Sequence, residues 1–372
     1  METALKLSVD QVEREVARLW EEEARTSGGA RVELLTLVAL VSEPQLLERA
    51  QSVLAEVVKR IQSRTIVAVW RDGAEPAITA DATLHRLAPG GAACGDSITL
   101  EAIGAAREWL PGNADRLALS DLPVCIWWVG DLPDHDDLFD RMVVNADVVI
   151  VNSQEMDLRD LEKLSSIAQR SRGRYALADL AWARLRWVQD LVARFFDDEQ
   201  GRACLRDLER IDIAFSPRDG EKDAASTRSG LLFGWLAHVL DLPLDRPLWK
   251  RGDTWAEVTL GHVVTRFEQR PHKGVRPGGL VRLAIECKTG RFEIQRQEED
   301  YQAFRWSREV PGAPTPPQVL RVLSLDEPTL LLRCLERPRR DPLLETSLQV
   351  GSRIVRPVAP RLSRRPPGTP PS

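Results

Sequence analysis

The stretch DLPVCIWWVGD, residues 121–131, is the most apolar short run of the chain. A proline near its start and a glycine near its end leave residues 123–129, which are β-branched, aromatic and too few for a helix. We therefore predict a buried strand that is covered on both faces. Successive side chains of a strand point to opposite faces, so we expect Trp127 and Trp128 on different sides. One of them is expected in the core, and the other faces outward near the strand's carboxyl end.

Working outward from this strand, further predicted strands alternate with helices. Buried apolar runs at residues 31–41, 64–70, 146–153 and 174–180 predict strands, and the segments between most of them have helical periodicity. Such an order predicts a parallel sheet with helical crossovers. The glycine-rich stretch PGGAACGD, residues 89–96, has no Lys-Ser or Lys-Thr after it and leads into a predicted strand. We therefore expect a plain turn there and no phosphate-binding loop.

The chain divides by pattern into four parts. Residues 1–30 contain an amphipathic helix, and residues 31–178 form the α/β, Rossmann-like domain with its mostly parallel sheet. Short alternating strands after residue 253 predict an antiparallel meander, so residues 179–352 are expected to form a mixed α+β C-terminal domain. Residues 353–372 are rich in proline and arginine, and we expect them to be disordered.

Polar residues follow the predicted strands at their carboxyl ends. Asp131, Ser153 and Asp179 each come at or after the end of a buried strand. Parallel strands bring such residues to one edge of the sheet, where α/β proteins usually bind ligands. The amphipathic helix that begins at Asp179 adds an aromatic and basic surface near this edge. The candidate residues for binding a partner or effector are Trp127, Trp128, Asp131, Ser153, Asp179, Trp182 and Arg184.

Composition excludes several classes of protein. A net charge of −5 in 372 residues argues against nucleic-acid binding, because no broad excess of Lys and Arg is available. Five widely spaced cysteines without a C-x-x-C pair indicate reduced thiols, with neither disulfides nor a metal site. We find no signal peptide pattern and no run of about 20 apolar residues, so we expect a cytoplasmic protein that does not enter membranes.

The sequence contains no recognisable catalytic motif. The G-x-G-x-x-G, P-loop, G-x-S-x-G and H-E-x-x-H patterns are all missing, and the five histidines are widely spaced. We therefore assign no catalytic residue, no metal site and no cofactor. Eleven tryptophans stand against two tyrosines, and tryptophan is the residue most enriched at hot spots of protein interfaces. We nevertheless expect most of the eleven to fill the core, because large aromatic side chains stabilise mainly by burying apolar area.

Four stretches resemble the glucose-6-phosphate dehydrogenase assembly protein (OpcA) family in order and spacing. They are DLPVCIWWVGDLP, ADVVIVNS about fifteen residues later, DLAWARL and LLFGWLAHVLDL, and the resemblance extends over roughly residues 31–336. It implies a non-catalytic partner that binds glucose-6-phosphate dehydrogenase and activates it allosterically in the oxidative pentose phosphate pathway. The dehydrogenase would carry the NADP and the sugar phosphate.

A second function stays open from the residues alone. An α/β enzyme or sensor could bind a sugar phosphate or a nucleotide in the crevice at the same strand ends. Asp131, Ser153 and Asp179 would then be the ligand-facing groups.

Overall fold

The computed structural model describes residues 7–27, 31–88, 91–132, 137–156, 158, 160–217, 226–244, 247–312, 315–336 and 340–355. The chain divides into two compact units, residues 1–194 with 321–345, and residues 195–320 with 346–372. Residues 356–372, most of the tail that we predicted to be disordered, lie outside the described residues. No helix in the described ranges is long and apolar enough to cross a membrane.

The first unit is built on a seven-stranded sheet with the order β3-β4-β2-β1-β5-β6-β7. All neighbouring strands are parallel except β3, which pairs antiparallel with β4 at the edge. The strands are β1 Thr36–Val41, β2 Arg64–Arg71, β3 Ala77–Arg86, β4 Ala93–Ile103, β5 Val124–Val129, β6 Val148–Val151 and β7 Ala176–Asp179. This is the doubly wound Rossmann order with one added edge strand, and it confirms the predicted fold class.

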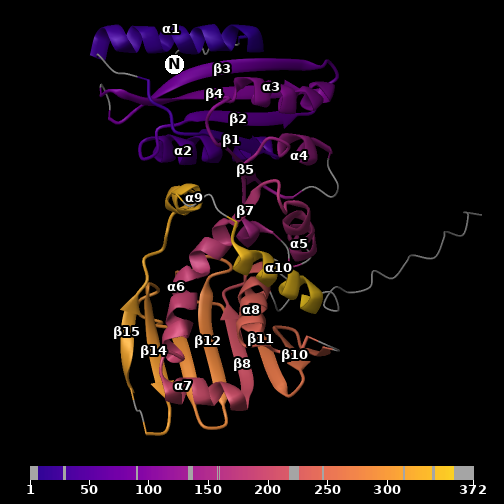
Figure 1. The fold of residues 1–372 in the computed structure, drawn as a ribbon, viewed down its shortest axis with the longest axis vertical. Helices are drawn as coiled ribbons and strands as arrows, with labels where there is room; N and C mark the ends of the chain where they lie inside the picture. Colours follow the sequence, from indigo (N-terminus) through magenta and orange to yellow (C-terminus); the bar gives the residue numbers. More distant parts are fainter. Residues whose placement is uncertain are drawn as a thin grey trace, which may run out of the picture. The chain divides into compact units, whose positions relative to one another are not determined.

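Helices connect and cover these strands (Figure 1). They are α1 Val9–Ser27, η1 Pro44–Leu46, α2 Leu47–Val58, η2 Gly104–Trp109, α3 Leu110–Leu117, α4 Asp137–Met142, η3 Ser153–Glu155, α5 Asp160–Arg170 and α6 Leu180–Phe195. Two further helices come late in the chain, α9 Glu327–Glu336 and α10 Pro342–Val355. Residues 353–355, which were predicted to be disordered, still belong to α10.

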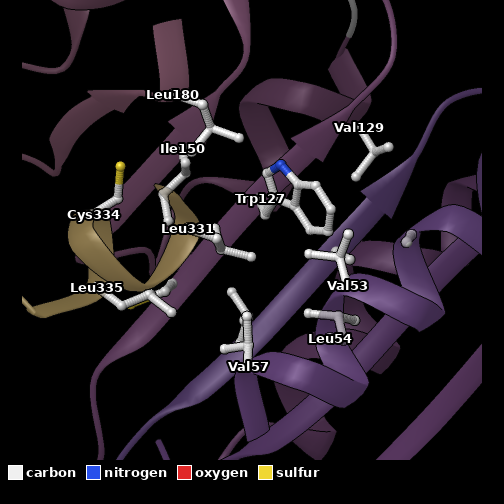
Figure 2. Close-up of a cluster of buried hydrophobic side chains, with 14 of the residues drawn as sticks. Val53, Leu54, Val57, Trp127, Val129, Ile150, Leu180, Leu331, Cys334 and Leu335 are labelled. Carbon is white, nitrogen blue, oxygen red and sulfur yellow. The ribbon is translucent and has the colours of Figure 1, made fainter. Parts of the chain in front are cut away.

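Both faces of β5 are covered, and each tryptophan lies in a different core. Trp127 is 1% exposed and packs in an apolar cluster with residues from α2 and α9 (Figure 2). Trp128 is 2% exposed and makes an edge contact with Phe139 of α4, with ring centroids 5.2 Å apart. The expectation that one tryptophan faces outward is therefore wrong, because helices close both faces of the sheet.

The helix α9 reaches the Trp127 core from a distant part of the sequence. Leu331 and its neighbours lie in the same cluster as Leu54 of α2 (Figure 2). The two helices are also joined by a bidentate ion pair, in which the Arg49 guanidinium donates to both carboxylate oxygens of Glu327 at 2.8 and 2.6 Å. Although sequence analysis groups residues 327–336 with the C-terminal domain, they contribute to the core of the first unit.

A buried group of charges lies at the amino end of the same sheet. Arg64, the first residue of β2, is 1% exposed and donates to Asp96 Oδ1 at 2.9 Å and to Glu13 of α1 at 2.6 Å. Asp96 is fully buried and also accepts hydrogen bonds from Trp20 of α1 at 3.0 Å and from Arg31 at 3.1 Å. These contacts fasten α1 to the sheet.

Two sequence predictions near this cluster need correction. The turn expected over residues 89–96 ends earlier, because β4 already begins at Ala93 and places Asp96 in the strand opposite Arg64. The strand expected from residue 31 begins only at Thr36. The residues before Thr36 include Arg31 and Glu33, whose side chains pair with each other at 3.1 Å beside Asp96.

The second unit is built on an eight-stranded sheet with the order β15-β14-β13-β12-β8-β11-β10-β9. Its strands are β8 Leu208–Phe215, β9 Leu248–Arg251, β10 Trp255–Leu260, β11 Val263–Gln269, β12 Leu280–Cys287, β13 Arg291–Arg296, β14 Ala303–Glu309 and β15 Thr315–Arg321. Most neighbours are antiparallel, and β11 and β8 are parallel. The helices are α7 Glu199–Cys204, η4 Leu205–Asp207, α8 Thr227–Val239 and the part of α10 from residue 346 on. The meander is confirmed, although sequence analysis missed the edge strands β9 and β15.

Candidate functional site

The carboxyl ends of β6 and β7 are joined by a buried carboxylate. Asp179 is 2% exposed, and its Oδ2 accepts a hydrogen bond from the Ser153 hydroxyl at 2.6 Å. Its Oδ1 accepts from the backbone N–H groups of Ser153 at 2.9 Å and Ala181 at 3.0 Å. Asp179 thereby ties the start of α6 to the end of β6. The two residues do meet at one edge of the sheet, as parallel strands require.

The first turns of α6 make further contacts away from this carboxylate. The half-buried Arg184 donates through Nη1 to Gln154 Oε1 at 2.6 Å. The buried Trp182 donates its indole N–H to Asp341 Oδ2 at 2.9 Å, and the other oxygen of Asp341 accepts from Leu343 at the start of α10. Both side chains therefore hold loops and helix ends of the first unit in place.

The turn after β5 carries the last of the candidate residues. Asp131 is exposed, and its backbone carbonyl accepts the indole N–H of Trp128 at 2.9 Å. Gly130 before it has φ +105°, a conformation that favours glycine. The Ser42 hydroxyl, which follows β1, donates to the Val129 carbonyl at 3.0 Å. Of the candidate residues, Asp131 presents the most accessible side chain.

The turn after β1 differs chemically from a dinucleotide-binding turn. That fingerprint has glycines, which let the backbone approach a pyrophosphate, and backbone N–H groups at a helix start. Here the turn is Ser-Glu-Pro-Gln over residues 42–45, with no glycine. Pro44 lacks an N–H group, and the carboxylate of Glu43 would repel an anion at this helix end. These residues do not fit a bound pyrophosphate.

The described residues contain no group of three or more His, Cys, Asp or Glu arranged to hold a metal ion. All five cysteines are free and buried. Burial raises the pKa of the Cys125, Cys287 and Cys334 thiols to about 12. These three thiols are therefore protonated at neutral pH and unreactive as nucleophiles.

One exposed aromatic residue escaped the sequence analysis. All eleven tryptophans belong to the described residues, and Trp109, at the end of η2, is the most exposed of them at 50%. Pro111, two residues further along the chain, lines a cavity of about 290 Å³ together with Val38, Ile126 and Met142. Val144, which lines the same cavity, is 57% exposed. The Pro111-Gly112 pair just after Trp109 was the available signal, because such pairs mark surface turns.

Comparison with known proteins covers most of the chain. Residues 54–169 match the N-terminal domain, and residues 175–348 the C-terminal domain, of a family described as "Glucose-6-phosphate dehydrogenase subunit". A putative OxPP cycle protein OpcA of Nostoc punctiforme is 32% identical over 176 residues. The counterpart of Synechocystis is 32% identical over 152 residues. These matches cover 46% and 40% of the chain and 35% and 30% of the relatives, so the chain spans about a third of the length of the curated relatives it matches.

A solved structure extends the comparison to the fold. The transcriptional regulator Gal80p from Kluyveromyces lactis superposes with a TM-score of 0.51 at 12% sequence identity, over 89% of this chain and 93% of that one. At this identity the likeness concerns the fold alone, a Rossmann-like unit followed by a unit with a large mixed sheet. The two family matches, which lie end to end over both units, carry the assignment. The chain belongs to the glucose-6-phosphate dehydrogenase assembly protein (OpcA) family.

Proposed function

We propose that this chain is a non-catalytic assembly factor that binds glucose-6-phosphate dehydrogenase and activates it allosterically. The observation that carries the proposal is the pair of family matches, which together extend from residue 54 to residue 348. The chemistry of the first unit supports it, because the Ser153 and Asp179 side chains bond to each other at the predicted ligand edge. Five free thiols fit the proposed cytoplasmic location.

Allosteric activation requires that this chain bind the active state of the dehydrogenase more tightly than the inactive state. Couplings of this kind are typically about 1–3 kcal/mol, which corresponds to an increase of roughly 5- to 150-fold. The experiment is a steady-state assay of the cognate dehydrogenase with and without this chain, together with gel filtration of the mixture. We expect co-elution and an increase in kcat/KM within that range. Unchanged kinetics and separate elution would contradict the proposal.

The surface around Trp109 is our proposed contact for the dehydrogenase. An exposed tryptophan has the properties of an interface hot spot, where one large side chain becomes buried against the partner. The cavity lined by Pro111 begins two residues after it in the sequence. The burial of Trp127 and Trp128 leaves them no direct contact with a partner in this conformation. Asp131 and Arg184 stay candidates for the same interface, because neither side chain is fully buried.

The Trp109→Ala variant separates binding from stability. We expect it to weaken binding of the dehydrogenase at least tenfold, as truncation of a hot spot does, with little change in the free energy of unfolding. Tyr301→Ala is the matched control, since Tyr301 is a comparably exposed aromatic residue in the second unit. Equal affinities of the two variants, measured by titration calorimetry, would exclude the Trp109 surface while leaving the proposed function intact.

A further inference from the structure

The sheet of the second unit has one apolar face and one charged face. Side chains alternate along each strand, and the first face consists of fully buried residues such as Ile211, Leu283 and Ile294. The opposite face of the five strands β10, β11, β8, β12 and β13 carries long charged side chains in adjacent register positions. We define the charged face by eight of these residues, Arg210, Asp212, Glu257, Arg266, Arg282, Glu286, Arg291 and Glu293.

The eight side chains form one continuous network of ion pairs across the five strands. Each residue pairs with at least one neighbour on the next or the same strand, and cations alternate with carboxylates along the network. The N···O distances are 3.5 Å for Arg266–Glu257, 3.4 Å for Arg210–Glu257, 2.8 Å for Arg210–Asp212, 3.2 Å for Arg282–Asp212, 2.6 Å for Arg282–Glu293, 3.2 Å for Arg291–Glu293 and 3.6 Å for Arg291–Glu286.

These side chains cover the sheet beneath them and remain partly exposed to solvent. Ala214 and Ala284 point to the same face as Asp212, yet they are almost fully buried, which means that the longer side chains cover them. The charged side chains themselves keep between 14% and 43% of their surface exposed. The ion-pair partners that the structure gives them all belong to the charged face. Their order is thus set within one chain, before any partner arrives.

The charge balance and the size of this face identify the kind of partner it fits. Four arginines stand against four carboxylates, so the face has no net charge with which to attract a strongly acidic or basic partner. Alternating charges are complementary to a second copy of themselves, and a two-fold symmetric dimer uses one patch on both protomers. Five strands about 4.8 Å apart and roughly 20 Å long give a flat projection on the order of 500 Å². The side chains that project from this plane and the flanking strands add accessible area. The total therefore approaches the ~800 Å² that each partner buries in a stable interface.

We propose that the charged face is the surface through which two copies of this chain associate. Because the ion pairs are formed in the single chain, few side chains lose freedom on association, and each charge enters the interface with a partner. Arginine is suited to such a face, since its planar guanidinium can bond a second carboxylate while it keeps the first. The dimer is expected to weaken with salt, because its cross-chain contacts are ionic.

The test uses a variant that breaks none of these ion pairs. Ser307 on β14 lies beside Glu293 in the register and points to the same face, so Ser307→Arg adds bulk and charge at the edge of the network. Thr83→Arg is the matched control, because Thr83 is an exposed position on the edge strand β3 of the first unit. Circular dichroism checks that both variants fold. Sedimentation equilibrium of the full chain then gives the mass, which is 41.7 kDa for a monomer.

We expect the wild type and Thr83→Arg to sediment as dimers with equal dissociation constants, and Ser307→Arg to raise that constant at least tenfold. Raising NaCl from about 0.05 M to about 1 M should raise the wild-type constant by a similar factor. A wild type that stays monomeric at ~100 μM, where a standard interface is saturated, would overturn the proposal. So would equal constants for the two variants. If the wild type is monomeric and Ser307→Arg instead abolishes capture of the dehydrogenase, the face belongs to that partner and self-association is wrong.

Discussion

The two ends of the first sheet hold their carboxylates in different ways. At the amino end, Asp96 is neutralised by the buried Arg64 and by Arg31, and it lies beside a second acid, Glu33. At the carboxyl end, N–H and O–H donors of Ser153 and Ala181 stabilise Asp179. The carboxyl end is where α/β proteins usually bind ligands. The denser group of buried charges nevertheless lies at the other end, where it fastens α1.

The difference shows that a strongly shifted pKa does not by itself mark a functional site. Burial and the Asp96 carboxylate raise the pKa of Glu33 to about 7. Shifts of this kind are typical of active sites, but structural ion-pair networks produce them as well. Here the perturbed acid joins the segment before β1 to the strand β4, and the residues that it contacts have a structural role. Mutations at the two ends should therefore change the free energy of unfolding by different amounts and with different pH dependence.

The largest effect is expected for Arg64→Met at the amino end. This change leaves Asp96 buried without its main cation, and removal of one partner from a buried ion pair costs about 3–5 kcal/mol. Urea unfolding followed by tryptophan fluorescence measures the loss. Arg18→Met is the control, because Arg18 pairs with Glu15 and Glu22 on the exposed side of α1, where ion pairs contribute little to stability. Similar losses for both variants would show that the buried pair does not stabilise the fold.

A smaller loss is expected for Asp179→Ala at the carboxyl end. The variant leaves the buried Ser153 hydroxyl and two backbone N–H groups without this acceptor, which should cost about 2–3 kcal/mol. Asp326→Ala is the matched control, since Asp326 caps the exposed start of α9 by accepting a hydrogen bond from the Thr329 N–H. Its loss should cost about 1 kcal/mol. Thermal and urea unfolding of the two variants give the comparison. A loss at Asp179 no greater than that at Asp326 would contradict its bridging role.

The two tryptophans of β5 allow a finer comparison. Trp128→Phe removes the hydrogen bond from the indole to the Asp131 carbonyl, whereas the indole N–H of Trp127 has no hydrogen-bond partner among the described residues. Both changes remove the same volume from a buried position. We therefore expect Trp128→Phe to cost about 1 kcal/mol more than Trp127→Phe in urea unfolding. The opposite order would mean that packing against α2 and α9 outweighs the hydrogen bond.

Much of the fold could be predicted because its signals are local. Strands such as β5 and β6 are short apolar runs between turn residues, and amphipathic helices such as α1 show their period directly. The start of β1 was misplaced because Arg31 and Glu33 continue the strand-like run but bind Asp96 instead. The place of α9 could not be predicted, since its contacts with α2 join residues as far as 278 positions apart and leave no local pattern.

The candidate site could be predicted only in part. The pairing of Ser153 with Asp179 follows from parallel strands whose ends share one edge, so sequence alone brought them together. Their use as ligands or contacts stays a prediction. The burial of Trp128 depends on Phe139 of α4, and a strand pattern does not show which helix covers which face. Trp109 was missed because η2 is too short for a helical period to reveal its exposed side.

The last comparison concerns the pH dependence of stability through Glu33. In the folded protein burial and Asp96 raise the pKa of Glu33 from the ordinary 4.5 to about 7, so the folded state keeps a proton that the unfolded state has lost. The stabilising contribution of this proton is complete below pH 4.5 and is lost as the pH rises to about 7. Asp96 acts in a separate, lower range. Burial raises the pKa of Asp96, but the hydrogen bonds from Glu33 and Arg64 lower it by more. Its pKa is therefore below the ordinary value, and its contribution to stability is lost only in acid.

Glu33→Gln tests this contribution, because glutamine is neutral at every pH and its amide can still donate to Asp96. We expect the free energy of unfolding of the wild type to fall between pH 4.5 and 7 relative to that of Glu33→Gln, and the two curves to run parallel above pH 7. Urea unfolding at half-unit pH steps measures both curves. Parallel curves across the whole range would show that Glu33 titrates normally. Asp96 would then be held by Arg64, Arg31 and Trp20, without a shared proton.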